Sequence, residues 1–226
     1  MVATPHAGET DAAAGSGTRT ELVVLLDESG RATGTFDKRR VHTTDTPLHL
    51  AFSCYVFDRA GRFLLSQRAL HKATWPGVWT NSCCGHPGPG EAIPDAVRRR
   101  LADELGLTDV RGPFLALPTF RYRAAMDDGT VENEMCPVYW ALADGPASPS
   151  PDEVADVRWM PWAEYGDAVR SGQLAVSPWA RQQLQELADL GPDPLDWDAA
   201  DDGQLPPAAR DAAGAAVEPS TAEPDA

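Results

Sequence analysis

The sequence predicts an α/β sandwich with a mixed sheet, and three observations lead to this fold class. Short apolar runs bounded by turn residues recur along the chain, which is typical of strands. One strongly periodic helical segment lies among them, and two more helical segments follow near the end of the domain. Strands arranged around one central helix, with helices added late, favour a layered α/β architecture.

The 226-residue chain is long enough for one domain with short tails. We expect the ordered domain to span residues 21–190. Residues 1–20 and 191–226 are rich in Ala, Pro, Gly, Asp and Thr and offer few side chains to a core. Both ends are therefore predicted to be disordered, and Trp197 is the one residue of the second tail that could dock onto the domain.

The first half of the domain is predicted to consist of strands. Residues 21–26 form an apolar run closed by a turn, which predicts a buried strand. Residues 48–57 form the strongest apolar run and predict one long strand. The turn at 58–61 then leads into a hairpin partner at 62–66, and a further strand is expected to end at Cys84.

A helix is predicted over residues 94–105. Pro94 stands at its first position, where the missing N–H is no loss, and Gly106 is suited to end it. Apolar side chains recur every four residues from Val97 to Leu105, which predicts one buried face.

The remaining elements are a hairpin, a strand and two helices. The turn residues Asp127, Asp128 and Gly129 separate two apolar stretches, which predicts a long hairpin. Its two arms, the next strand and the two helices are expected at residues 114–123, 130–142, 154–160, 161–171 and 178–189.

Charge and composition exclude several classes of protein. The net charge is −15, of which −8 lies in residues 191–226, and this argues against nucleic-acid binding. No run of about 18 apolar residues is present, so no membrane span is expected. The start of the chain lacks the features of a signal peptide, and the four cysteines match neither a disulfide framework nor a CxxC zinc site. A cytoplasmic protein with reduced thiols is expected.

Two short stretches carry the predicted chemistry. Residues 80–87 (Thr-Asn-Ser-Cys-Cys-Gly-His-Pro) place the thiol of Cys84 beside an imidazole. Residues 132–137 (Glu-Asn-Glu-Met-Cys-Pro) carry two carboxylates that share one face if the segment is a strand. Taken singly, the cysteine is more often a packing residue and the carboxylates more often a solvated face. Together they predict a metal-assisted acid/base site.

A third pattern starts at Gly85 and resembles the Nudix box, G-x5-E-x7-R-E-U-x-E-E-x-G-U. The matching positions are Glu91, Arg99, Glu104 and Gly106. Arg100 and Asp103 stand where the motif has glutamates. The resemblance implies a Nudix-like α/β/α sandwich, but the loss of a carboxylate to Arg100 weakens the case for hydrolysis. A base at this position favours an intact diphosphate.

With its flanking motifs the chain resembles the type I isopentenyl-diphosphate isomerases over about residues 21–185. The further matching stretches lie at 42–53, 68–70, 75–87, 120–123, 132–134 and 177–179. The resemblance implies interconversion of isopentenyl and dimethylallyl diphosphate in isoprenoid biosynthesis by protonation and deprotonation. It also implies divalent metals without an organic cofactor, and we expect a monomer or weak dimer.

The resemblance also implies roles for individual residues. Cys84 and Glu134 match the acid/base pair, and Tyr122 and Trp179 match aromatic residues near the isoprenoid carbons. The implied metal-binding set is His42, His49, His86, Glu132, Glu134, Glu104 and Cys84. Within this set Glu104 helps to hold a Mg²⁺ on the diphosphate, whereas the histidine-rich group holds Mn²⁺, Zn²⁺ or Mg²⁺. The implied diphosphate contacts are Lys38, Arg68, Lys72 and Arg100.

Two other functions stay open at this point. The chain could be a Nudix pyrophosphohydrolase acting on a nucleoside diphosphate derivative, which phosphate release would reveal. It could also be a non-catalytic module that binds a metal or a diphosphate without turnover. For the isomerase, we expect Glu134, through Tyr122, to donate a proton to C4 and Cys84 to remove one from C2. The sequence leaves that order open.

Overall fold

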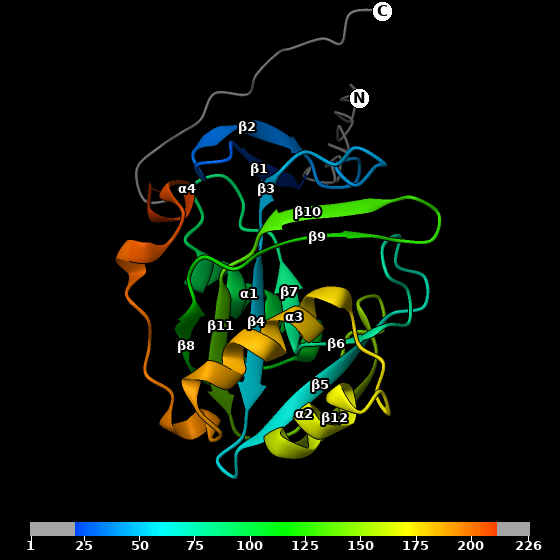
Figure 1. Cartoon of the computed structure of the whole chain (residues 1–226), viewed down its shortest axis with the longest axis vertical. Helices are drawn as coiled ribbons and strands as arrows, with labels where there is room; N and C mark the ends of the chain where they lie inside the picture. Colours follow the sequence, from blue (N-terminus) through cyan, green and yellow to red (C-terminus); the bar gives the residue numbers. More distant parts are fainter. Residues whose placement is uncertain (1–20, 212–226) are drawn as a thin grey trace, which may run out of the picture.

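The computed structural model describes residues 21–211 (Figure 1). The strands are β1 (Leu22–Leu26), β2 (Ala32–Asp37), β3 (His49–Leu50), β4 (Phe52–Phe57), β5 (Arg62–Arg68), β6 (Trp79–Thr80), β7 (Cys83–Gly85), β8 (Val110–Leu117), β9 (Arg121–Ala125), β10 (Val131–Met135), β11 (Val138–Ala143) and β12 (Val154–Pro161). The α-helices are α1 (Ile93–Leu105), α2 (Trp162–Arg170), α3 (Pro178–Leu187) and α4 (Pro207–Arg210). Three 3-10 turns lie at Ala188–Leu190, Pro194–Asp196 and Asp202–Gln204.

The described strands form two mixed sheets. The five-stranded sheet has the order β2-β1-β3-β10-β9, and the seven-stranded sheet has the order β12-β5-β4-β11-β8 with β6 and β7 paired onto β5 and β4. Each sheet contains one parallel pair, β3 with β10 and β4 with β11. In Figure 1, β9 and β10 cross one end of β4 and β11. The predicted α/β class with mixed pairing is confirmed, although the sequence indicated one sheet.

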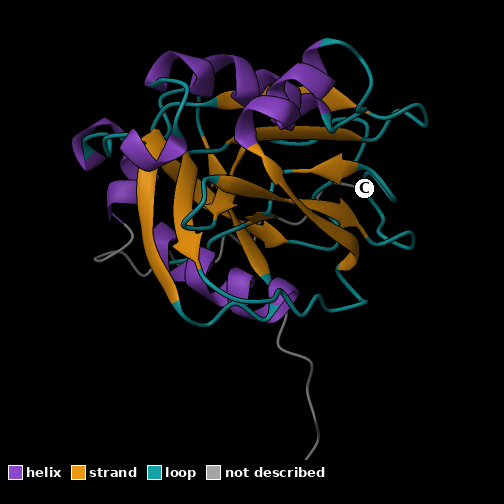
Figure 2. Ribbon diagram, turned by 90° about the horizontal axis from the view of Figure 1, so that it is seen from below, coloured by secondary structure: helices purple, strands orange, loops and turns teal. Residues whose placement is uncertain are grey.

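Helices cover both faces of the seven-stranded sheet, as Figure 2 shows. Along the fully buried β4, Phe52, Cys54 and Val56 belong to a core cluster that includes the apolar face of α1. Tyr55 and Phe57 belong to a second cluster with residues of α2 and α3. Because side chains alternate along a strand, β4 supplies both layers of the sandwich. Full burial of each such side chain contributes about 1.5–3 kcal/mol.

The predicted central helix is α1, which begins one residue earlier than expected. Gly106 ends it with a left-handed backbone (φ 66°), and its N–H bonds to the carbonyl of Ala102. A glycine adopts this conformation without the steric cost that a side chain would bring. The buried face carries Arg100 and Glu104 beside its apolar residues, so the helix turns two charged groups inward.

The expected strand 48–57 is broken at Ala51. Residues before the break pair in the five-stranded sheet as β3, and residues after it pair in the seven-stranded sheet as β4. The expected arm 130–142 breaks in the same way at Cys136 and Pro137, between β10 and β11. The predicted hairpin therefore exists only as β9–β10, because β8 pairs with β11. Both segments stay buried across the break, so their apolar runs gave no sign of it.

The expectation of disorder from residue 191 onward is wrong for residues 191–211. Trp197 is buried and packs edge-on against the rings of Phe57, Trp140 and Trp162. Further along, Leu205 and Ala209 join the first core cluster. The predictions for residues 1–20 and 212–226 lie outside the described residues. Among residues 21–211, no helix has the length and apolar character that crossing a membrane requires.

Candidate active site

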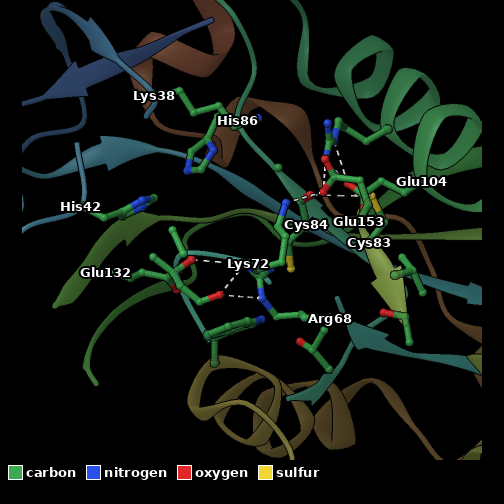
Figure 3. Close-up of a pocket in the computed structure, with 18 of the residues that line it drawn as sticks. Lys38, His42, Arg68, Lys72, Cys83, Cys84, His86, Glu104, Glu132 and Glu153 are labelled. Atoms are coloured by element: carbon green, nitrogen blue, oxygen red, sulfur yellow. Dashed lines mark hydrogen bonds and ion pairs between the residues drawn. The ribbon is translucent and has the colours of Figure 1, made fainter. Parts of the chain in front are cut away.

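A cavity of about 630 Å³ is lined by residues of both sheets, of α1 and α3, and of the connecting loops (Figure 3). The predicted site residues that line it are Lys38, His42, Arg68, Lys72, Cys84, His86, Arg100, Glu104, Tyr122, Glu132, Glu134 and Trp179. His49 is fully buried directly behind this wall. Figure 3 shows His42 and Glu132 on one side, Glu104 and Glu153 on the other, and Cys84 between them.

Three imidazoles and one carboxylate converge at the first end of the cavity. His42, His49, His86 and Glu134 each offer one ligand atom, and these atoms lie within 4.8 Å of one another. The Nε2 atoms of the three histidines lie 4.0, 3.4 and 3.1 Å from Oε1 of Glu134. Strand register explains part of this, because parallel pairing sets His49 directly opposite Glu134. His86 follows β7 and closes the group.

The nitrogen atoms that face one another in this group could hold a divalent cation. Nδ1 of His49 donates to the carbonyl of Pro47 at 2.9 Å, which leaves Nε2 as the atom that faces the group. The buried Nε2 of His42 has no hydrogen-bond partner. Burial lowers the pKa of His42 to about 4 and lowers that of His86 as well, so both are neutral imidazoles at physiological pH. A nitrogen-rich set with one carboxylate suits Zn²⁺ or Mn²⁺.

Tyr122 links the two carboxylates of β10. Its hydroxyl lies 2.9 Å from Oε2 of Glu132 and 2.9 Å from Oε2 of Glu134. Burial and the charge of Glu134 raise the pKa of Glu132 to about 7. Burial also opposes ionisation of Glu134, but hydrogen bonds with His49 and His86 hold its pKa well below the usual value. The three groups therefore keep an exchangeable proton beside one fixed carboxylate.

Three members of the predicted metal-binding set lie outside the four-residue group. Glu132 faces Tyr122, and Glu104 lies at the other end of the cavity, where it was expected. The sulfur of Cys84 lies between the two ends and bonds to Asn81.

The thiol of Cys84 shares a hydrogen-bond acceptor with an indole. Its sulfur lies 3.1 Å from Oδ1 of Asn81 and 3.5 Å from the hydroxyl of Ser53. Nε1 of Trp179 donates to the same Oδ1 at 3.0 Å. The ring of Trp179 lies 5.5 Å from that of Tyr122 between centroids. Burial raises the pKa of the Cys84 thiol to about 12. The sequence placed Asn81 in the cysteine motif but gave it no role.

The second end of the cavity is a network of ion pairs. Nη2 of Arg100 lies 2.6 Å from Oε1 of Glu104 and 3.1 Å from Oε2 of Glu153. Glu153 also pairs with Lys72. Burial raises the pKa of Glu104, although the charge of Arg100 opposes that shift. The sequence did not indicate Glu153, because it stands in a turn before β12 with nothing to separate it from other surface acids.

Two more predicted diphosphate contacts line the same cavity. Lys38 pairs with Glu21 at 2.6 Å. The guanidinium of Arg68 donates twice to the carbonyl of Thr74, at 3.1 and 2.9 Å. These four basic side chains, together with Arg39, thus line one cavity in a strongly acidic protein. An anion that enters the cavity can replace the carboxylates that are paired with Lys38, Lys72 and Arg100.

Comparisons with known proteins agree with this geometry. The family model of the NUDIX domain matches residues 47–184. The isopentenyl-diphosphate Delta-isomerase of Saccharopolyspora erythraea is 57% identical over 194 residues, which cover 86% of this chain and 100% of that protein. The protein of the same name from Mycolicibacterium vanbaalenii is 56% identical over 173 residues, covering 76% and 93%. That from Rhizobium rhizogenes is 46% identical over 193 residues, covering 84% and 91%.

Solved structures show the same fold at much lower identity. A crystal structure of a Deinococcus radiodurans protein aligns with a TM-score of 0.57 and 16% identity, over 74% of this chain and 99% of that one. A MutT protein from Methanosarcina mazei aligns with a TM-score of 0.50 and 16% identity, over 63% and 94%.

Proposed function

The chain belongs to the isopentenyl-diphosphate Delta-isomerase family and carries a Nudix domain, and we propose how its cavity interconverts isopentenyl and dimethylallyl diphosphate. One observation carries the proposal. The thiol of Cys84 and the carboxylate of Glu134 border the same cavity, and basic side chains gather at its other end. This arrangement supports proton chemistry on a short carbon chain whose diphosphate is held apart from the reacting atoms.

The reaction moves a double bond from C3=C4 to C2=C3. One proton is added at C4 and one is removed from C2, so the numbers of protons and electrons in the substrate and the product are equal. Protonation of an unactivated alkene gives a tertiary carbocation, which needs a water-poor site with negative or π charge around it. Trp179 is buried beside Cys84 and can contribute about 0.5–2 kcal/mol as a cation–π partner.

We assign proton delivery at C4 to Glu134 acting through Tyr122. The Tyr122 hydroxyl gives its proton to C4, and the carboxyl of Glu132 returns one to it while Glu134 stays ionised. The hydroxyl of Tyr122 is within hydrogen-bond reach of both carboxylates, and Glu132 titrates near neutral pH. A proton is therefore available to this group at working pH. Cys84 is assigned to C2, where its thiolate accepts the proton and its thiol returns it in the reverse reaction. Burial favours the thiol, and the charge of Arg68 opposes that preference.

Metal ions complete the assignment. The group His42, His49, His86 and Glu134, with Glu132 beside it, would hold Mn²⁺, Zn²⁺ or Mg²⁺. A bound cation would supply positive charge that keeps Glu134 ionised and fixes its orientation toward Tyr122. A second ion, Mg²⁺, would be held by Glu104 together with the diphosphate.

The diphosphate is assigned to the basic end. Arg100 and Lys72 share Glu153, and both can turn to phosphate oxygens when the substrate enters. Lys38 and Arg68 lie on the same wall. Binding energy from this remote anion positions a five-carbon chain that offers few contacts of its own.

One chain supplies every residue of this assignment, so we propose a monomer or a weak dimer. We also propose a cytoplasmic location, because all four cysteines are free and Cys84 must stay reduced to work.

The test is proton NMR of isopentenyl diphosphate with the purified protein and Mg²⁺ in deuterated buffer. The proposal predicts conversion to dimethylallyl diphosphate with solvent deuterium in the methyl group derived from C4. Conversion without solvent label would exclude protonation. Phosphate release from nucleoside diphosphate derivatives would identify a hydrolase, and tight diphosphate binding without exchange would identify a binding module.

A further inference from the structure

Asn81 lies at the centre of the reactive side chains without touching either metal end. It is fully buried in the turn between β6 and β7. Its side-chain oxygen lies 3.1 Å from the sulfur of Cys84 and 3.0 Å from Nε1 of Trp179. Two reactive groups from distant parts of the chain thus meet at one atom.

The orientation of the Asn81 amide is fixed by its partners. Its Nδ2 donates to the backbone carbonyls of Cys54 at 3.2 Å and Cys83 at 2.6 Å, and carbonyls only accept. The indole N–H of Trp179 only donates, so it requires the oxygen on its side. A flipped amide would break all three bonds, and the group facing Cys84 is therefore an acceptor.

A second chain of hydrogen bonds holds the other side of the sulfur. Tyr55 donates to Oε1 of Gln183 at 3.0 Å, which directs Nε2 of Gln183 to the hydroxyl oxygen of Ser53 at 2.9 Å. The hydroxyl hydrogen of Ser53 is then left for a sulfur, and the sulfur atoms of Cys84 and Cys136 lie 3.5 and 3.4 Å away. Asn81 and Ser53, which face the sulfur of Cys84, are both fully buried.

We propose that Asn81 is a positioning residue, whose side-chain oxygen accepts from the thiol of Cys84 and from the indole N–H of Trp179 and so sets the two groups in one fixed arrangement. This inference rests on the proposed isomerase function. It explains how a thiol on a three-residue strand and an indole on a helix stay aligned with the same substrate. With the sulfur fixed, only one of the two hydrogens on C2 lies within its reach. Without Asn81, the thiol can rotate and reach both.

The main test compares three variants in deuterated buffer during long incubation with isopentenyl diphosphate. The wild type is expected to exchange one C2 hydrogen. Asn81→Leu removes the shared acceptor, so the second C2 hydrogen should exchange too, and kcat should fall about 100-fold with little change in KM. Asn81→Asp, which burial between two carbonyls keeps protonated, retains an acceptor oxygen toward the sulfur and a donor toward the carbonyl of Cys83, and it should retain single exchange. The matched control is Asn133→Leu, which alters a neighbouring amide without touching sulfur or indole.

The ratio of the two exchange rates is independent of how much protein is folded, so a general loss of structure does not mimic the effect. Single exchange in Asn81→Leu, or double exchange in Asn81→Asp, would overturn the proposal.

A second measurement needs neither turnover nor the leucine variant. In protein with ¹⁵N-labelled tryptophan, the indole N–H of Trp179 is assigned by its loss in Trp179→Phe. It should exchange slowly with water and shift in Asn81→Asp. An indole N–H that exchanges as fast as free indole would overturn the arrangement. A wild type that exchanges no substrate hydrogen would refute the isomerase function alone, since the indole result stands apart from it.

Discussion

The two ends of the cavity are built from opposite charge patterns. At the first end, three imidazole groups and the carboxylate of Glu134 converge. At the second end, Arg100 and Lys72 are each paired with a carboxylate. A cluster of donor atoms fits a metal ion, whereas paired cations fit an anion that replaces their partners. This difference is the basis on which we propose that a diphosphate binds at one end and protons move at the other.

The largest expected effect comes from the proposed acid/base pair, Cys84 and Glu134. Cys84→Ala and Glu134→Gln should each reduce turnover by about 10³-fold or more, because each removes a proton-transfer group. Both proteins should stay folded by circular dichroism. Cys54→Ala is the matched control, because Cys54 is buried in the first core cluster away from the cavity. Near wild-type turnover by either variant would remove that residue from the acid/base pair.

The next largest effect is expected from removal of the metal ion that we assign to the first end. A chelator is expected to abolish turnover and to lower the thermal midpoint by several degrees, because ligand binding stabilises the folded state by mass action. His42→Ala should show a much smaller decrease on chelation, since one donor is already missing. Equal decreases in both proteins would place the metal elsewhere.

A substitution at the second end should weaken substrate binding and therefore raise KM. Arg100→Leu removes a charged partner of the diphosphate and should raise KM about 10-fold to 100-fold, in line with about 1.5–3 kcal/mol for a hydrogen bond to a charged group. Arg98→Leu lies on the exposed side of the same helix and serves as the control. A fall in kcat with unchanged KM would instead connect Arg100 to the proton chemistry.

The smallest effect concerns stability in acid. The pKa of His42 falls from 6.5 to about 4 on folding because of burial. The unfolded chain therefore binds this proton first, and the metal-free protein should lose stability as pH falls from 6.5 toward 4. Glu132, whose pKa burial and Glu134 raise to about 7, takes up its proton in the folded state over the same range and opposes this loss. The stability that comes from the raised pKa of His49 is already complete at pH 6.5. We expect the His42 contribution alone to be about 1–2 kcal/mol, measured as the difference in urea unfolding between the wild type and His42→Phe. His42→Phe should reduce the slope, and an unchanged slope would contradict the assignment.

Much of this site was predictable because its residues lie in short, dense motifs. The sequence indicated the cysteine, histidine and carboxylate side chains together with basic and aromatic ones, and twelve of these predicted residues border the cavity. It did not indicate where β3–β4 and β10–β11 pass from one sheet to the other, because Ala51 and Cys136 are as buried as their neighbours. That crossing sets His49 opposite Glu134.

Other features depend on contacts that no local pattern carries. Asn81 acquires its indole partner only when the fold brings Trp179 of α3 to it. In the sequence Glu153 is one acidic turn residue among several, and only the folded structure places Arg100 and Lys72 against it. Trp197 docks among aromatic rings that lie more than thirty residues away along the chain, so the composition of its segment was a poor guide.

Metal titration by calorimetry, with and without pyrophosphate, tests the contrast between the two ends most directly. The metal-free protein should bind about one Mn²⁺ ion, and His42→Ala should lose that binding. Pyrophosphate with Mg²⁺ should add a second site that depends on Glu104 and leaves the first intact. A protein that binds Mn²⁺ only when pyrophosphate is present, or that keeps its first site in His42→Ala, would contradict the account.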